Sequence, residues 1–296
     1  MTLNNDNYSV LPFYESEAMQ ECRRRGAQGM FYGLRTKTGL LPPFQVIMPL
    51  QNIVSIEKYA YDWQRMKMYP DGENGEPVHI WNATGSDTPD YFTQIDLGGG
   101  YMALMYDGQT AVTCNDKEGY FALVITTEGG DKFFSEPFCT VGNTANFLRV
   151  EWWDDADLMT ATAGIYYGRN PKYRNILLLQ TELGMPDYRF DEEGEERDGY
   201  FFPEKQLSEK TYRFSFVAPE YVCDAMRLIR LSDHKRITDK FGRVYNCDTF
   251  EMSVEWQTGY LAAVTCEFET ATVVKKLAAL SYGDFNNDFN DDYNKA

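Results

Sequence analysis

Two histidines are the residues best suited to acid–base chemistry near neutral pH, because the ordinary pKa of imidazole lies close to neutrality. They are His79 and His234. His234 stands beside Lys235 and Arg236, and a cation near the C-terminus of a helix is stabilised there without any catalytic role. No Gly-x-Ser-x-Gly nucleophile motif accompanies either histidine. We therefore interpret both as structural, and predict no catalytic residues and no enzymatic activity.

Motifs for metals and phosphate-containing cofactors are also missing from the sequence. The chain contains no Cys-x-x-Cys, no His-Glu-x-x-His and no Walker-type loop ending in Gly-Lys-Ser or Gly-Lys-Thr. Its cysteines are widely spaced, which favours buried thiols in a reducing compartment over disulfides or a metal site. We predict neither metal nor cofactor. The cysteines are Cys22, Cys114, Cys139, Cys223, Cys247 and Cys266.

The last residues carry a partial calcium motif. Asp284, Asn286 and Asp288 repeat the first three ligand positions of an EF-hand loop. Phe289 occupies the position that requires glycine for the sharp turn, and Lys295 replaces the bidentate glutamate. We therefore favour a solvated acidic tail over residues 283–296, with weak calcium binding as the open alternative.

A carbohydrate-related function is the alternative that the sequence leaves open. Trp152 and Trp153 precede Asp154 and Asp155, and aromatic rings beside carboxylates are typical of sugar-binding platforms. Neighbouring residues of a strand point to opposite faces, so one tryptophan is expected in the core. The chain also has 45 acidic residues, among which a catalytic carboxylate pair cannot be recognised without spatial distances. A carbohydrate-binding module or glycoside hydrolase is therefore the second hypothesis.

The segment 190–205 is the candidate for contact with other proteins. It reads FDEEGEERDGYFFPEK, and its acidic residues are expected to hold it in water as an extended loop. Aromatic residues follow directly before Pro203, and aromatic anchors with a polar rim are typical of protein interfaces. Insertion of these rings into the protein's own core is the alternative. The candidate interface residues are Tyr200, Phe201, Phe202, Glu192, Glu193, Glu195 and Glu196.

The rest of the sequence is organised as short apolar runs separated by turn signals. Glycine turns are predicted at 98–100, 107–108 and 129–130, with no helix of useful length between the runs, which favours a sandwich or barrel over a βαβ fold. Strict alternation predicts a strand at 211–217 and a hairpin of strands 250–256 and 261–269, turning at Thr258-Gly259. Apolar residues at helical spacing after Pro219 predict one amphipathic helix at 219–231.

These elements divide the chain into four segments. Residues 1–40 are expected to form an N-terminal arm, because prolines and a basic run interrupt any regular pattern. Residues 41–142 are expected to form a β-sandwich domain, 143–282 a second β domain with the helix, and 283–296 a flexible tail. The predicted fold is mainly β, with two β-sandwich-like domains and one amphipathic helix in the C-terminal domain.

The charge of the chain restricts its partners. Its formal net charge is -17, which repels phosphate backbones and anionic lipid, so we expect no sequence-specific nucleic-acid binding and no membrane association. An acidic ring that lets DNA pass without sticking is compatible with this charge. No apolar run approaches the ~20 residues of a membrane span, and the first ten residues lack the features of a secretory signal. We expect synthesis in a cytoplasm.

Several phrases of the sequence resemble structural proteins of tailed phages and prophages of gut Bacteroides, including the crAss-like phages. The resemblance covers about residues 11–276. It rests on short sequence segments, none of which contains a catalytic motif. The phrases are LPFYES, LPPFQ, KFFSEPFCTV, LGMPDYRFDEEGEE, FFPEKQLSEKTYRFSFVAPEYVCDAMRLIRLSD and EWQTGYLAAVTCEFETATVVKK.

This resemblance implies a structural component of the virion, made in the host bacterial cytoplasm. The protein would belong to the tail or to the portal-proximal neck, and would form a ring-shaped homo-oligomer around a DNA channel. Its partners would be copies of itself and other tail or neck proteins. An acidic, aromatic-rich β protein suits such a part, because it must pack against neighbours and leave DNA free to move.

Overall fold

The chain is mainly β, as the sequence predicted, with 55% strand and 8% helix. Its strands form sheets consistent with β-sandwich-like domains. The computed structural model describes residues 9–24, 31–82, 88–112, 116–155, 165–167, 170–257, 260–270 and 274–277. Within this part of the chain, no helix combines the length and the apolar character that crossing a bilayer requires.

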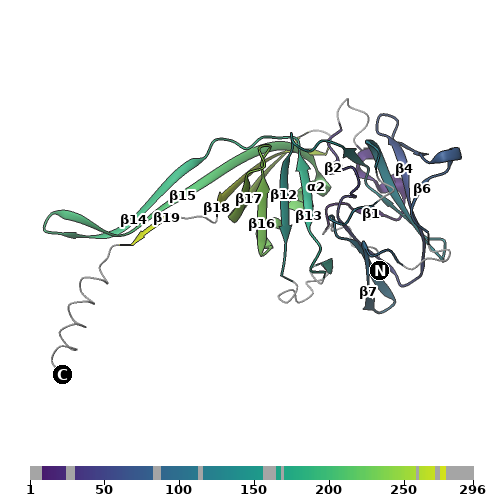
Figure 1. Cartoon of the computed structure of the whole chain (residues 1–296), viewed down its shortest axis with the longest axis horizontal. Helices are drawn as coiled ribbons and strands as arrows, with labels where there is room; N and C mark the ends of the chain where they lie inside the picture. Colours follow the sequence, from purple (N-terminus) through teal and green to yellow (C-terminus); the bar gives the residue numbers. More distant parts are fainter. Residues whose placement is uncertain are drawn as a thin grey trace, which may run out of the picture.

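The N-terminal half of the chain forms an eight-stranded and a three-stranded sheet (Figure 1). In the larger sheet, β9 is central and pairs with β4, β10 and β11. The smaller sheet has the order β3-β8-β7. The strands of the larger sheet are β1 (Phe13–Tyr14), β2 (Leu34–Lys37), β4 (Ile53–Asp62), β5 (Lys67–Pro70), β6 (Val78–Asn82), β9 (Gly119–Thr127), β10 (Lys132–Ser135) and β11 (Phe138–Val141), and those of the smaller sheet are β3 (Phe44–Pro49), β7 (Phe92–Gly98) and β8 (Tyr101–Tyr106). Short helical turns lie at η1 (Glu17–Met19), α1 (Glu21–Arg24) and η2 (Glu73–Gly75).

Aromatic rings fill the core beneath the smaller sheet. Phe44 of β3 and Tyr106 of β8 stack with ring centroids 6.1 Å apart, and Phe92 of β7 meets Tyr106 edge-on at 6.2 Å. The Tyr106 hydroxyl accepts the Leu41 N–H at 3.3 Å and donates to the Thr110 carbonyl at 2.7 Å. A buried tyrosine needs such partners, since an unpaired buried hydroxyl is costly. This ring therefore fixes the segment before β3 and the segment after β8.

The triple glycine forms the β7–β8 turn, as predicted. All three residues have positive φ, at 74°, 62° and 81° for Gly98, Gly99 and Gly100. Only glycine adopts three successive residues of this kind without strain. The turn joins two strands and does not open a helix, so it lacks the geometry of a phosphate-binding loop.

The expected N-terminal arm is in part built into the larger sheet. β1 pairs antiparallel with β10, and β2 pairs parallel with β11, from Leu34↔Phe138 to Lys37↔Val141. Leu11 and Leu34 are almost fully buried, which explains why this segment packs against the strands despite its prolines. The prediction of a separate arm is therefore incomplete, because β1 and β2 within residues 9–24 and 31–40 belong to the sheet.

The C-terminal half forms a second eight-stranded sheet in the order β13-β12-β16-β17-β18-β15-β14, with β19 paired to β15. The predicted hairpin is confirmed in β17 and β18, which pair from Phe250↔Phe268 to Trp256↔Ala262. Its turn residues Thr258 and Gly259 lie outside the described residues. The strands are β12 (Leu148–Trp153), β13 (Asn175–Leu179), β14 (Asp187–Arg197), β15 (Tyr200–Pro219), β16 (His234–Thr238), β17 (Val244–Trp256), β18 (Leu261–Thr270) and β19 (Val274–Leu277).

The predicted helix is present but shorter than expected. α2 (Glu220–Met226) begins after Pro219, and a separate 3-10 turn, η4 (Ile229–Leu231), follows it. Tyr221, Val222 and Ala225 are buried, and α2 packs against β15 and β18. The Tyr221 hydroxyl accepts the Leu34 N–H at 3.3 Å and so links this helix to β2 of the larger N-terminal sheet. Ile229 is buried too, so the apolar pattern of the sequence continues from α2 into the 3-10 turn. For this reason the pattern predicted one helix that is longer than α2.

The two groups of sheets lie end to end, and β14 with the first part of β15 projects from the far end of the molecule (Figure 1). This projection is the most distinctive feature of the shape. The predicted tail at 283–296 and its partial calcium motif lie outside the described residues.

Candidate protein interface

The segment predicted as an extended acidic loop is a β-hairpin, which corrects that expectation. β14 and β15 pair from Asp187↔Thr211 to Arg197↔Tyr200, with one irregularity after Glu193. Asp198 and Gly199 form the two-residue turn with φ of 53° and 80°. Two positive φ angles are what a type I′ turn requires, and Asp-Gly is among its preferred sequences. We call residues 187–207 the projecting hairpin.

The projecting hairpin is exposed on both faces. Residues 187–196 and 198–201 are all exposed. β18 pairs with β15 only from Thr211 onwards, and β19 covers only the stretch from Lys205 to Ser208, so the outer part has no third strand among the described residues. A lone two-stranded hairpin is marginally stable in water. The outer part therefore lacks the packing that normally holds such a pair of strands.

The two faces of the projecting hairpin carry different sets of aromatic rings and carboxylates. Side chains alternate along β14, so Tyr188 and Phe190 share a face with Glu196, whose cross-strand partner is Phe201. These three rings are 60%, 74% and 50% exposed. The opposite face carries the carboxylates of Asp191, Glu193 and Glu195, together with Tyr200, which is 73% exposed. Glu192 also lies on the first face and Arg189 on the second, so both faces combine aromatic rings with carboxylates.

The structure brings the predicted interface residues together at the outer end of the projecting hairpin. Tyr200 and Phe201 are exposed, so the alternative in which these rings enter the protein's core does not hold for either. Glu192, Glu193, Glu195 and Glu196 are exposed as well, whereas the side chain of Phe202 lies outside the described set. The sequence reasoning missed Tyr188, and it included Phe190 in the candidate segment without naming it as an interface residue. The Asp-Gly pair was the signal that would have placed both on a hairpin.

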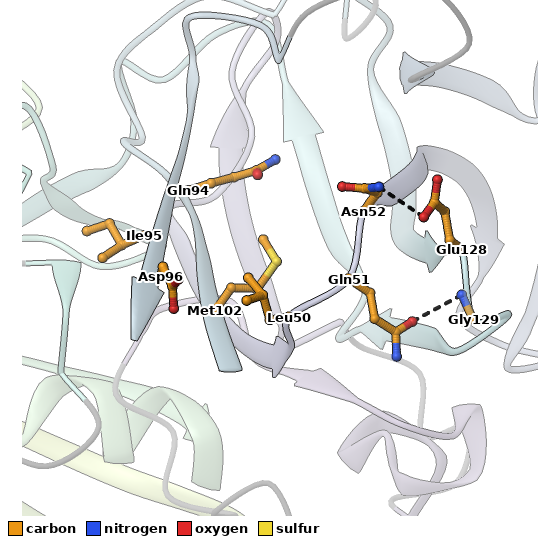
Figure 2. A pocket seen from close by; sticks show the side chains of 9 residues that line it. All are labelled: Leu50, Gln51, Asn52, Gln94, Ile95, Asp96, Met102, Glu128 and Gly129. Carbon is orange, nitrogen blue, oxygen red and sulfur yellow. Dashed lines mark hydrogen bonds between the residues drawn. The ribbon is translucent and has the colours of Figure 1, made fainter. Parts of the chain in front are cut away.

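A shallow hollow of about 710 Å³ lies between the three-stranded sheet and the β4–β9 region (Figure 2). Its rim is fixed by Asn52, which donates to Glu128 Oε2 at 2.9 Å, and by Gln51, whose Oε1 accepts the Gly129 N–H at 3.0 Å. The lining contains two carboxylates, Asp96 and Glu128, but no histidine, cysteine, serine or lysine. They are Leu50, Gln51, Asn52, Gln94, Ile95, Asp96, Met102, Glu128 and Gly129.

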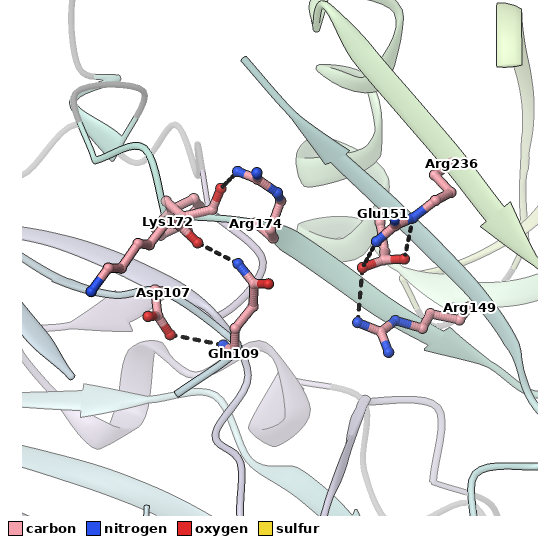
Figure 3. Close-up of polar contacts among 8 residues, drawn as sticks. Asp107, Gln109, Arg149, Glu151, Lys172, Arg174 and Arg236 are labelled. Atoms are coloured by element: carbon pink, nitrogen blue, oxygen red, sulfur yellow. Dashed lines mark hydrogen bonds and ion pairs between the residues drawn. The ribbon is translucent and has the colours of Figure 1, made fainter. Parts of the chain in front are cut away.

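A buried carboxylate organises the surface of β12 and β16 (Figure 3). Glu151 is 2% exposed and accepts from Arg236 through Nε and Nη2 at 2.9 and 3.0 Å, and from Arg149 Nη2 at 2.8 Å. A bidentate guanidinium and a second donor satisfy a buried carboxylate well. Both carboxylate oxygens of Glu151 are used in ion pairs, and the pair with Arg236 joins β12 to β16.

Close to this cluster, hydrogen bonds join the turn after β8 in the N-terminal half to the segment before β13 in the C-terminal half. The Asp107 carbonyl accepts the Arg174 N–H at 3.1 Å, and the Gln109 side chain donates to the Lys172 carbonyl (Figure 3). Gly108 has φ of +79°, and a Cβ there would lie 2.9 Å from the Arg174 carbonyl oxygen. The close approach of the two backbones thus requires glycine at this turn.

The tryptophan pair divides as predicted between core and surface. Trp152 is 1% exposed. The Trp153 ring stacks on His234 with centroids 5.1 Å apart, and the guanidinium carbons of Arg174 and Arg236 lie 4.5 and 5.2 Å from its centroid. Sugar platforms need an open ring face. The neighbours of Trp153 occupy the space that a sugar would need on at least one face.

Neither histidine lines the hollow of Figure 2 or a second hollow that is bounded by β2, β12 and β13. His79 Nδ1 lies 3.6 Å from Glu57 Oε1, and His234 Nε2 lies 3.0 Å from Asp155 Oδ1. Both side chains are nearly half exposed, at 47% and 43%. His234 is the first residue of β16 and lies three residues after the end of η4, so it is part of a strand, which corrects the helix-end interpretation of this residue.

The cysteines of the described chain form no disulfide. Burial raises the pKa of the Cys223 and Cys247 thiols to about 12, and that of Cys266 further still. Cys114 lies outside the described residues. Within the described residues, no three His, Cys, Asp or Glu side chains come together as a metal site.

Comparisons with known proteins add no family. No family model matches the chain, and no curated protein matches it. Among solved structures, the extracellular portion of mouse CD200RLa aligns over 82% of this chain and 90% of its own length, with 9% identity and a TM-score of 0.14. A similarity of this size supports no conclusion about fold or function, so the functional argument rests on the molecule itself.

Proposed function

We propose that this protein is a structural subunit of a multi-protein assembly and that the projecting hairpin is its main contact element. In line with the sequence resemblance, the assembly would be a ring in the tail or portal-proximal neck of a tailed bacteriophage. Copies of the chain would form the ring, and other tail or neck proteins would bind to it. The acidic charge would keep DNA from adhering to such a ring.

The observation that carries this proposal is the exposure of the projecting hairpin. Tyr188, Phe190, Tyr200 and Phe201 each expose at least half of their surface on a hairpin with solvent on both faces. Burying one large side chain contributes about 1.5–3 kcal/mol, so these rings leave a large stabilisation unused in the isolated chain. A partner that covers them would supply the packing that the outer hairpin lacks.

Removal of two exposed rings of the projecting hairpin tests the proposal. We expect the double variant Phe190→Ser/Phe201→Ser to lose assembly without a change in the melting temperature of the monomer, because neither ring contributes to the core. Two anchors of about 2 kcal/mol each correspond to a dissociation constant raised about 1,000-fold. Light scattering after gel filtration measures the mass, and electron microscopy of the purified wild-type protein shows whether rings form.

The matched control is Leu50→Ser/Tyr69→Ser, which removes two exposed apolar side chains from the N-terminal half. This control is expected to assemble like the wild type. A wild-type protein that stays monomeric at all concentrations and is absent from phage particles would refute the proposal. So would equal effects of the two double variants on assembly.

A further inference from the structure

We propose that a basic groove between the two halves of one copy receives the projecting hairpin of a second copy, so that subunits join head to tail. This inference rests on the proposed function and identifies the partner surface. The groove has a volume of about 320 Å³. It is bounded by β2, by β12 and β13, and by the turn between β16 and β17.

The charge of the groove is opposite to that of the whole chain. In a protein with 45 acidic and 28 basic residues, four basic side chains line this groove beside a single carboxylate. That carboxylate, Asp239, binds Arg243 Nε at 2.6 Å and accepts two backbone N–H groups. Desolvation alone would raise the pKa of Asp239, but the bonds from Arg243 and Phe241 outweigh it and lower that pKa. The negative charge of Asp239 is therefore already balanced by Arg243, which is not one of the four basic residues that line the groove. The four basic side chains are Arg35, Lys37, Arg149 and Lys240.

Much of the positive charge is available to a ligand. Arg35 donates to the carbonyls of Phe31 and Gly33 and has no carboxylate partner within the described chain. Lys37 is exposed and forms no ion pair with any described residue. Arg149 shares one carboxylate with another arginine, as described above. Lys240 is paired with an exposed carboxylate, a contact that contributes little in water.

The walls of the groove suit aromatic side chains. Leu40, Pro43, Phe147, Ile176 and Leu178 provide apolar surface between the basic side chains. A ligand with both aromatic rings and carboxylates matches such a lining. The projecting hairpin presents both on one face, where Phe190 and Phe201 lie beside the carboxylates of Glu192 and Glu196.

The hairpin that fills the groove is assigned to a second copy because the groove and the projecting hairpin of one copy lie far apart. Figure 1 shows the projecting hairpin at one end of the molecule. β12 and β13, which bound the groove, lie at the opposite edge of the second sheet, and β2 belongs to the N-terminal half. The hairpin of a given copy therefore points away from the groove of that copy. A contact between unlike surfaces is heterologous, and repetition of such a contact closes into a ring when the rotation between subunits allows it.

Paired charge reversals test the inference. We expect the groove variant Lys37→Glu/Lys240→Glu and the hairpin variant Asp191→Lys/Glu196→Lys each to be monomeric in sedimentation velocity. Mixed together, they retain one intact groove and one intact hairpin per pair. The reversed groove and the reversed hairpin are also opposite in charge, so the mixture is expected to assemble with the two variants alternating. Exposed lysines on β5 and β10 provide the charge-matched control, Lys67→Glu/Lys132→Glu, which is expected to assemble like the wild type.

The outcomes separate this inference from the proposed function. If the hairpin variant is monomeric and the groove variant assembles normally, the groove is not the acceptor, although the hairpin remains the contact element. If the mixture of the two variants stays monomeric, head-to-tail pairing is overturned. If deletion of the acidic residues 278–296 reproduces the groove variant, that tail is the occupant and the inference is also overturned. A monomeric wild type refutes the proposed function itself.

Discussion

Replacement of Glu151 by glutamine removes one negative charge from a buried cluster and keeps the side chain's size. The carboxylate is 2% exposed and receives three hydrogen bonds from two guanidinium groups. Glutamine accepts through one oxygen, and its amide nitrogen faces a donor. The substitution therefore removes charge-assisted bonds between β12 and β16 without opening a cavity.

The expected loss follows from the burial of each group. Breaking a fully buried ion pair costs about 3–5 kcal/mol, because an uncompensated charge remains. The side chains of Arg149 and Arg236 are 43% and 38% exposed, so water solvates part of the charge that the substitution leaves behind. We expect a loss of about 2 kcal/mol in the free energy of unfolding. For a protein of 296 residues, that loss lowers the melting temperature by about 3 °C.

Urea denaturation followed by circular dichroism measures this loss. Glu267 offers a matched control, because it also contacts two arginines, Arg189 and Arg213, but its side chain is 27% exposed and theirs are 56%. Glu267→Gln is expected to destabilise less. About 1 M salt shortens the screening length to about 3 Å, so the Glu151 effect should persist and the Glu267 effect should shrink. Equal losses for both variants would refute the assignment of Glu151 as a structural ion-pair centre.

Two further predictions concern the junction and the thiols. Gly108→Ala should destabilise the protein by about 1–3 kcal/mol in urea denaturation, because its Cβ would meet the Arg174 carbonyl at a positive φ. Gly39→Ala should cost less, since its φ is also positive but nothing lies within 4 Å of the added Cβ; equal costs would contradict the close approach. Cys223 and Cys247 should resist iodoacetamide at pH 8 until the protein unfolds, because burial raises both thiol pKa values to about 12 and leaves roughly one thiolate in 10,000. Mass spectrometry detects the labelling, and rapid modification of either thiol in the native protein would contradict their burial.

Strands with one buried face could be predicted from the sequence. Phe250 and Val264 are buried on β17 and β18, and polar residues alternate with them, so the pattern gave both the strands and their pairing. The pairing of β2 with β11 had no such local signal. It joins Leu34 to Phe138 across about a hundred residues, and only the tertiary packing selects it.

The projecting hairpin escaped prediction as a strand pair because it buries neither face. A period-two pattern arises when one face avoids water, and ten successive residues of β14 are exposed. Acidic residues at Glu192, Glu193, Glu195 and Glu196 gave the composition of a solvated loop. The composition correctly indicated exposure, whereas the Asp198-Gly199 turn indicated the backbone conformation.

The acidic residues of β14 also bear on which contacts the protein can form with its own copies. β14 is the edge strand of its sheet, and an unpaired edge invites strand addition by another chain. If two copies paired along this edge, carboxylates such as Asp191 and Glu195 would face those of the partner, and like charges in cross-strand positions are destabilising. Symmetric hairpin-to-hairpin pairing is therefore opposed by charge. A basic surface elsewhere on the subunit meets no such repulsion, so the charge distribution favours head-to-tail contacts over symmetric dimers.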